Sequence, residues 1–186
     1  FLDARPAQRD AVLGLIVGAT AAQVLRHGVF HADPHPGNFL VVPGDGDAPP
    51  RLAILDFGCV ERLDAEARRG YAAVVMAVAA GDDARLAAAL QQMGFATRDG
   101  DPETLRRLAE LMLEGVRPGS AGFAGIDPRQ QMERMLEMVR ENPVVEVPGH
   151  FVLLGRVLGA HGGLLMHYQP KLDLLQLLLP YLVTVG

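Results

Sequence analysis

The sequence predicts an α+β protein that is mainly helical, with one small β-hairpin carrying two polar loops. Helix signals recur along most of the 186 residues, since acidic residues precede apolar-periodic stretches and glycines follow several of them. Two short β-prone runs lie on either side of a stretch rich in turn formers. At this length, with 49% hydrophobic residues, one domain with a substantial core is expected.

The first helix is expected at residues 7–27, where apolar side chains occur nearly all round the helix and favour a buried position. Gly28 is expected to end it. Its most apolar part, residues 11–25, is too short and interrupted to span a membrane, and the apolar stretch at 172–185 is broken by polar residues and a proline. We therefore expect neither a membrane span nor a signal peptide in this sequence.

The hairpin is expected next. Residues 31–38, His-Ala-Asp-Pro-His-Pro-Gly-Asn, contain two prolines and a glycine, which predict a shaped loop rather than a helix or a central strand. The β-prone runs 39–42 and 52–55 follow, with a turn-rich segment between them. Their pairing would place Asp56, just after the second strand, beside Asn38, just before the first.

Beyond the hairpin the chain is expected to be helical. Acidic residues precede four of the predicted helices and can cap them, twice directly before a proline at the first helical position. The candidate caps are Asp64, either Asp82 or Asp83, Asp101 and Asp127. Breaks are expected at 117–122 and at Asn142–Pro143. The predicted helices are 65–80, 83–93, 102–115, 128–141, 149–165 and 171–183.

Charge and cysteine content narrow the function classes. The formal net charge of -5 argues against a nucleic-acid partner, which would need a basic surface. The single cysteine, Cys59, excludes an internal disulfide, fits a reducing compartment such as the cytoplasm, and is expected to be a small buried hydrophobe. The chain begins at Phe1 inside an apolar-periodic segment, so we expect it to be a piece of a longer protein.

The polar loops contain the residue types of a magnesium–nucleotide site. Magnesium prefers hard oxygen ligands, and Asn38 and Asp56 offer an amide oxygen and a carboxylate at one place. Asp33, on the same loop as Asn38, can accept or orient the proton of a phosphoryl acceptor. The pattern H-x-D-x-x-x-x-N followed by D-F-G thus predicts phosphoryl transfer.

These motifs resemble the catalytic and metal-binding loops of the protein-kinase-like fold. More narrowly, residues 30–41 and 55–58 resemble the UbiB family of atypical kinases of ubiquinone (coenzyme Q) biosynthesis. The resemblance extends over residues 1–186, which would form a kinase-like C-terminal lobe without its N-terminal lobe. It implies ATP and Mg²⁺ as cofactors.

The resemblance also implies roles for individual residues. Asp33 would be the catalytic-loop acid, and Asn38 and Asp56 would bind magnesium. His31 would brace the D-F-G turn, and Gly58 would keep that turn free of a side chain.

The remaining histidines receive weaker assignments. His35 lies where many protein kinases have a phosphate-contacting lysine, so it would contact phosphate or form a structural hydrogen bond within the loop. The others have no partners at ligand spacing and are expected at the surface or at helix ends. They are His27, His150, His161 and His167.

Departures from the protein-kinase pattern restrict the expected activity. Ala32 replaces the arginine that reads a phosphorylated activation loop in many of those enzymes, and only about five residues separate Gly58 from the next helix. A small-molecule acceptor or plain ATP hydrolysis is therefore expected rather than protein phosphorylation. The sole lysine, Lys171, cannot be the strand lysine that holds the α- and β-phosphates, so the isolated chain should bind nucleotide weakly and be inactive.

Three alternatives stay open. One is a small-molecule phosphotransferase of the aminoglycoside or choline kinase type, which shares both motifs. Another is a zinc or iron hydrolase using His31, Asp33, His35 and Asp56. The third is a pseudokinase binding module. The leucine-rich final segment of the chain would pack in the core, on the other lobe or on a quinone-biosynthesis protein. If it packs on a membrane surface instead, the protein would be a peripheral membrane protein.

Overall fold

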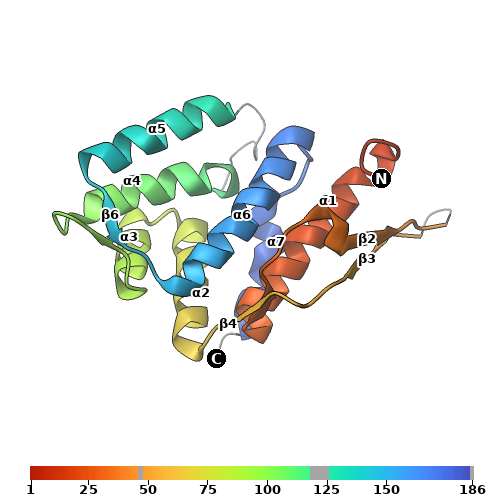
Figure 1. Ribbon diagram of the computed structural model, residues 1–186, viewed down its shortest axis with the longest axis horizontal. Coiled ribbons are helices and arrows are strands. Elements are labelled where there is room, and N and C mark those ends of the chain that lie inside the picture. Colours follow the sequence, from red (N-terminus) through yellow and green to blue (C-terminus); the bar gives the residue numbers. More distant parts are fainter. Residues whose placement is uncertain (46–47, 118–125, 185–186) are drawn as a thin grey trace.

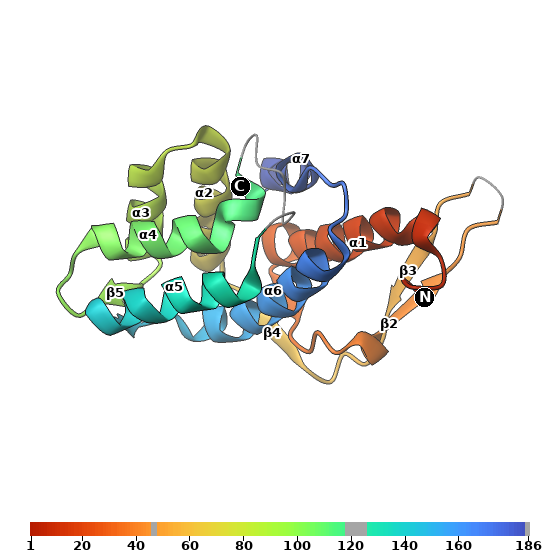
Figure 2. The same cartoon turned by 90° about the horizontal axis from the view of Figure 1, so that it is seen from above.

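The computed structural model describes residues 1–45, 48–117 and 126–184. Within them, helices form the body of the molecule, and the strands form two-stranded antiparallel pairs. Figures 1 and 2 show α2 to α5 gathered at one end, α1 with the β2–β3 hairpin at the other, and α6 between them. The expected α+β, mainly helical class is confirmed.

The first predicted helix is present, but its last turn is wound differently. α1 spans Pro6–Ala21 and continues as a π-helical segment, Ala22–His27. Gly28 ends it in the left-handed conformation with φ 66°, and a Cβ there would lie 2.7 Å from Cδ of Arg68. The positive φ favours glycine at this position, and a larger residue would also have to displace the Arg68 side chain.

Two pairs of short strands form the region of the polar loops. Their bounds are β1 Val29–His31, β2 Phe39–Val42, β3 Arg51–Ile54 and β4 Val60–Arg62. β2 pairs with β3, which confirms the hairpin, while the pairing of β1 with β4 was not predicted. His31, expected in the loop, instead ends β1. The first polar loop is hereafter residues 32–38, after β1, and the second is residues 55–59, after β3.

The four helices at the end of the molecule away from the β2–β3 hairpin begin at the predicted start signals. They are α2 Ala65–Ala80, α3 Asp83–Gln92, α4 Pro102–Leu113 and α5 Pro128–Glu141. Each begins after an aspartate whose carboxylate accepts a backbone N–H of the first turn; these are Asp64, Asp82, Asp101 and Asp127. The short pair β5 Ala96–Thr97 and β6 Val144–Glu146 was not predicted. Apart from Arg117, the predicted break at 117–122 lies outside the described residues.

The end of the chain differs from the single helix predicted at 171–183. α6 spans Gly149–Tyr168, α7 only Leu174–Leu178, and a 3₁₀ segment follows at Leu179–Thr184. Pro180 explains the difference, because proline has no N–H to donate within an α-helix. Of the helices in the described part of the chain, none combines the length and apolar character that crossing a bilayer requires.

The main core lies directly beneath the polar loops. Phe30 and Ala32, on either side of His31, are 1% and 0% exposed. They belong to a cluster with residues of α2 and α6, and Leu178 and Leu182 of the final segment pack against it. Cys59 packs there too, although it is half-buried rather than fully buried. The leucines of the final segment named here therefore serve the core.

Candidate functional site

The two polar loops lie opposite each other, between the two strand pairs. At one end the N–H of Leu55 donates to the carbonyl of Asn38 over 2.8 Å, next to the β2–β3 pair. At the other, the N–H of Ala32 donates to the carbonyl of Cys59 over 3.0 Å, next to the β1–β4 pair. The backbone thus fixes the loops relative to each other at both ends.

His31 joins the loops through its ring. Nε2 lies 3.0 Å from the carbonyl oxygen of Leu55 and 2.9 Å from that of Asp56. Nδ1 accepts the N–H of Asp33 at 3.2 Å. Since Nδ1 faces a donor and Nε2 faces two acceptors, the geometry requires the neutral ring with the proton on Nε2. The ring is also packed edge-on to Phe57, with centroids 5.3 Å apart.

Asp33 and Asn38 are in direct contact within the first loop. Nδ2 of Asn38 donates to Oδ2 of Asp33 at 2.9 Å and to the Asp33 carbonyl at 3.3 Å. Both partners are acceptors, which assigns the amide nitrogen to this side and leaves the Asn38 amide oxygen on the other side. Both residues are half-buried.

Asp56 begins the D-F-G turn in an unusual conformation. Its φ is 57°, in the left-handed region, which aspartate tolerates better than most residues. Its Oδ1 accepts the N–H of Gly58 at 3.2 Å, and the carboxylate is exposed. A Cβ on Gly58 would lie 3.0 Å from that same oxygen. Glycine thus gives the carboxylate room, and the backbone amide orients it.

His35 makes the structural hydrogen bond that was one of its two expected roles. Its Nδ1 accepts the N–H of Gly37 at 3.0 Å and caps the 3₁₀ turn Pro36–Asn38. The ring is exposed. The contact with phosphate stays a prediction.

Two residues that support the loops were not singled out from the sequence. Oε1 of Gln23, in the π-helical segment, accepts the N–H of His31 at 2.7 Å. Nη2 of Arg156, on α6, donates to the carbonyl of Ala32. Each is a polar residue in an otherwise apolar helical stretch, which is the signal that could have found them.

The expected surface position is wrong for His161. It is 5% exposed in the middle of α6, and burial lowers its pKa to about 4. Its ring lies edge-on to Phe39, which follows Asn38, with centroids 6.3 Å apart. Its Nε2 is buried and has no hydrogen-bond partner among the residues that the structure describes. The buried residues of α6 follow one another at helical spacing along one stripe, and His161 lies on that stripe with Leu154, Val157 and Leu165.

The other three histidines follow the expectation to different degrees. His27 and His167 are exposed near helix ends, as expected. His150, at the start of α6, is half-buried, and its ring is edge-on to Tyr71 at 5.5 Å.

The zinc or iron alternative is not supported. Both ring nitrogens of His31 face backbone groups, and Nδ1 of His35 accepts a backbone N–H. In the described part of the chain, no three His, Cys, Asp or Glu side chains are grouped to hold a metal. The oxygen donors of Asn38 and Asp56 suit a hard cation with few protein ligands instead.

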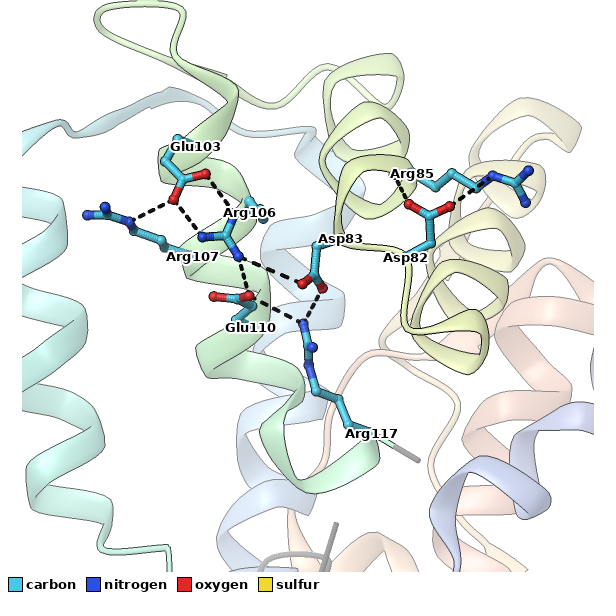
Figure 3. A network of polar contacts seen from close by, with 8 residues as sticks. All are labelled: Asp82, Asp83, Arg85, Glu103, Arg106, Arg107, Glu110 and Arg117. Carbon is cyan, nitrogen blue, oxygen red and sulfur yellow. Dashed lines mark hydrogen bonds and ion pairs between the residues drawn. The ribbon is translucent and has the colours of Figure 1, made fainter. Parts of the chain in front are cut away.

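A groove of about 450 Å³ lies between α4 and α5, at the end of the molecule away from the loops. Its neighbouring charges pair with one another, as Figure 3 shows. Arg117 contacts Asp83 at 2.6 Å and lowers the pKa of that carboxyl. Arg106 likewise lowers the pKa of Glu103 to about 2, through a hydrogen bond of 2.6 Å. These pairs join α3, α4 and the segment after α4.

Known proteins are similar to this chain. Residues 1–90 match the model of the ABC1 atypical kinase-like domain. An Arabidopsis thaliana protein named Activity of bc1 complex kinase 1, chloroplastic, is 30% identical over 90% of this chain and 24% of its own length. The uncharacterized protein sll0005 of Synechocystis is 29% identical over 89% of this chain and 23% of its own.

A third relative is more similar over a shorter stretch. Activity of bc1 complex kinase 3 of Arabidopsis thaliana is 54% identical over 25% of this chain and 6% of its own length. The chain thus spans about a quarter of the first two relatives. The match over residues 1–90 includes both polar loops and every predicted site residue. The chain therefore carries an ABC1 atypical kinase-like domain and belongs to the UbiB family, as its motifs predicted.

Proposed function

We propose that the two polar loops bind ATP through Mg²⁺ and carry phosphoryl transfer or ATP hydrolysis, in an atypical kinase of the UbiB type. One observation supports this most. Asn38 turns its amide nitrogen to Asp33, so its amide oxygen is available to a cation. A turn asparagine without that contact would give no such orientation.

The residues present fit magnesium. The donors are the amide oxygen of Asn38 and the carboxylate of Asp56, both hard oxygens, and Mg²⁺ typically takes one or two protein oxygens besides phosphate and water. The N–H of Gly58 holds Oδ1 of Asp56, which orients Oδ2. When bound, the ion would neutralise charge on the phosphates.

Asp33 would orient the phosphoryl acceptor and hold its proton. Oδ2 of Asp33 is held by Asn38, so Oδ1 is the oxygen that would accept the proton from a hydroxyl or from water. His31 would keep both loops at a fixed separation. His35, whose Nδ1 is bound within the loop, would offer Nε2 to phosphate.

The segment after the D-F-G turn supports a small acceptor, or water, over a protein substrate. The chain enters β4 at Val60, where it pairs with β1, and α2 begins at Ala65. A segment occupied by strand pairing does not present a surface on which a protein substrate could be laid.

For the whole protein the proposal is broader. Residues 1–186 would act as the C-terminal lobe, and a lysine-bearing N-terminal lobe would hold the remaining phosphates, since Lys171 is the sole lysine here. The activity would support ubiquinone biosynthesis. The partners would be quinone-biosynthesis proteins or a membrane surface, with no nucleic acid, and the location would be cytoplasmic and peripheral to the membrane.

Two other functions make different predictions. The family match does not favour the aminoglycoside and choline kinase alternative. A pseudokinase binding module would bind nucleotide or a partner without turnover.

The test is ATP turnover by the protein at its natural length, with the Asp56→Asn variant. Asp56→Asn should lower the Mg²⁺-dependent rate by at least about tenfold, because a metal ligand is weakened. Asp99→Asn is the matched control, since Asp99 lies exposed in the turn after β5, and its rate should not change. Equal rates for wild type and Asp56→Asn would reject the proposal, and nucleotide binding without turnover would favour the pseudokinase.

A further inference from the structure

Arg156 lies outside the motifs but contacts the residue before Asp33. It is on α6, 124 residues from Ala32 in sequence, and its Nη2 donates to the Ala32 carbonyl. Ala32 is 0% exposed. Its carbonyl therefore depends on a protein donor, and a guanidinium makes a stronger hydrogen bond to it than a neutral donor would.

The peptide unit between Ala32 and Asp33 is held at both of its polar atoms. Arg156 holds the carbonyl oxygen, and Nδ1 of His31 accepts the N–H at 3.2 Å. A peptide unit is planar, so fixing both atoms fixes the orientation of the whole plane. The plane fixes the N–Cα bond of Asp33, and Asn38 holds the Asp33 carbonyl on the other side, so together they set the direction in which the Asp33 side chain leaves the backbone.

The other groups around Asp33 do not duplicate this contact. Asn38 holds the carboxylate and the carbonyl of Asp33, on the far side of the residue. Cys59 accepts the N–H of Ala32, one peptide unit earlier. Among the described residues, Arg156 alone donates to the Ala32 carbonyl.

Arg156 also has no competing partner in the described part of the chain. No carboxylate lies within ion-pair distance of it there, whereas Arg106 and Arg117 each contact carboxylates. Its side chain is exposed and makes its hydrogen bond to the loop. A surface arginine directed at a backbone carbonyl rather than at an acid indicates a positional role.

We propose that Arg156 is a positioning residue that, together with His31, clamps the Ala32–Asp33 peptide and aims the Asp33 carboxylate. The inference rests on the proposed function for its kinetic consequence. The clamp itself is a property of the loop. The two parts are therefore tested by separate measurements.

The kinetic test uses the protein at its natural length. Arg156→Ala should lower kcat for ATP turnover by about tenfold or more while KM for MgATP changes by less than about twofold, since the clamp orients the acceptor side only. Arg156→Lys, which keeps a charged donor, should recover most of kcat. Arg85→Ala is the control, because its side chain is 79% exposed and, among the described residues, forms an ion pair with Asp82 alone.

The structural test does not require turnover. In the 186-residue chain, Arg156→Ala should raise hydrogen exchange at the Asp33 amide by about tenfold or more, with little change at the amides of α3. Arg156→Lys should restore the protection. Unchanged exchange at Asp33, or a kcat equal to that of wild type, would overturn the clamp. A wild-type protein without turnover but with the exchange effect would overturn the proposed function and retain the clamp.

Discussion

The Nε2 of His31 lies 2.9 Å from the carbonyl oxygen of Asp56, so a buried ring at the end of β1 holds the backbone of the second polar loop. The same nitrogen reaches the carbonyl of Leu55 at 3.0 Å. Asp56 is exposed and has a positive φ, which costs free energy unless neighbouring groups hold it. His31 supplies that support from the core side.

His31→Phe should therefore destabilise the protein. Phenylalanine keeps a ring beside Phe57 but leaves two carbonyls without a donor, so the free energy of unfolding should fall by about 1–3 kcal/mol. Urea denaturation measures the change. His27→Ala is the control, since His27 is exposed at a helix end, and it should change stability by less than about 0.5 kcal/mol. Equal losses in the two variants would contradict the bracing role.

Gly58→Ala should weaken cation binding without unfolding the protein. The new Cβ would lie 3.0 Å from Oδ1 of Asp56 and displace the carboxylate. The affinity for Mn²⁺ with ADP, measured by electron paramagnetic resonance, should fall by roughly tenfold. Gly159→Ala is the control, because a Cβ there meets nothing within 4 Å and displaces no neighbouring side chain. An unchanged affinity would contradict the role of Gly58 in leaving room for the Asp56 carboxylate.

His161 should make stability depend on pH. Its pKa falls from 6.5 to about 4 on folding, so the unfolded chain takes up the proton first as the pH decreases. Above about pH 6.5 the neutral His161 does not lower the free energy of unfolding. As the pH falls towards 4, protonation of the unfolded chain lowers that free energy by roughly 3 kcal/mol. Denaturation curves at pH 7 and pH 4 give the difference in the free energy of unfolding between the two pH values. His161→Leu should make that difference smaller than in wild type. His167→Leu, at an exposed position, should behave as wild type; a parallel pH dependence for His161→Leu would refute the assignment.

The charged pairs of Figure 3 should make stability depend on salt and acid. Arg106 contacts Glu103, Glu110 and Asp83, so Arg106→Met should lower the melting temperature at low salt, and the difference should shrink in 1 M NaCl. Because the pKa of Glu103 is lowered to about 2 in the folded state, its contribution is present above about pH 4.5 and lost below. A difference that is independent of salt would point to lost packing of the arginine stem instead.

Local signals predicted most of the helices and the hairpin. Asp64, Asp101 and Asp127 each cap a helix as predicted, and Asp82 rather than Asp83 caps α3, because a cap depends on residues within one turn. Phe39 pairs with Ile54 in the predicted hairpin, since a turn-rich segment between two β-prone runs sets the pairing locally.

The features that were missed depend on residues distant in sequence. Val29 pairs with Arg62 only after the hairpin brings the two segments together, so three-residue strands gave no signal of their own. The same applies to Arg156, whose partner is 124 residues away. The site residues could be predicted from the sequence because they form two compact motifs. The orientation of the Asn38 amide, with its nitrogen towards Asp33, could not be predicted in this way.

The pairing of β1 with β4 has a consequence for how the site could open. The strand after the D-F-G turn is bonded to the strand that ends at His31, and the His31 ring is bonded to the turn itself. Pulling the turn outward would break the ladder and the ring contacts together. The two loops should therefore exchange their amide hydrogens as one cooperative unit, with similar opening free energies at Ala32, Asp33 and Leu55.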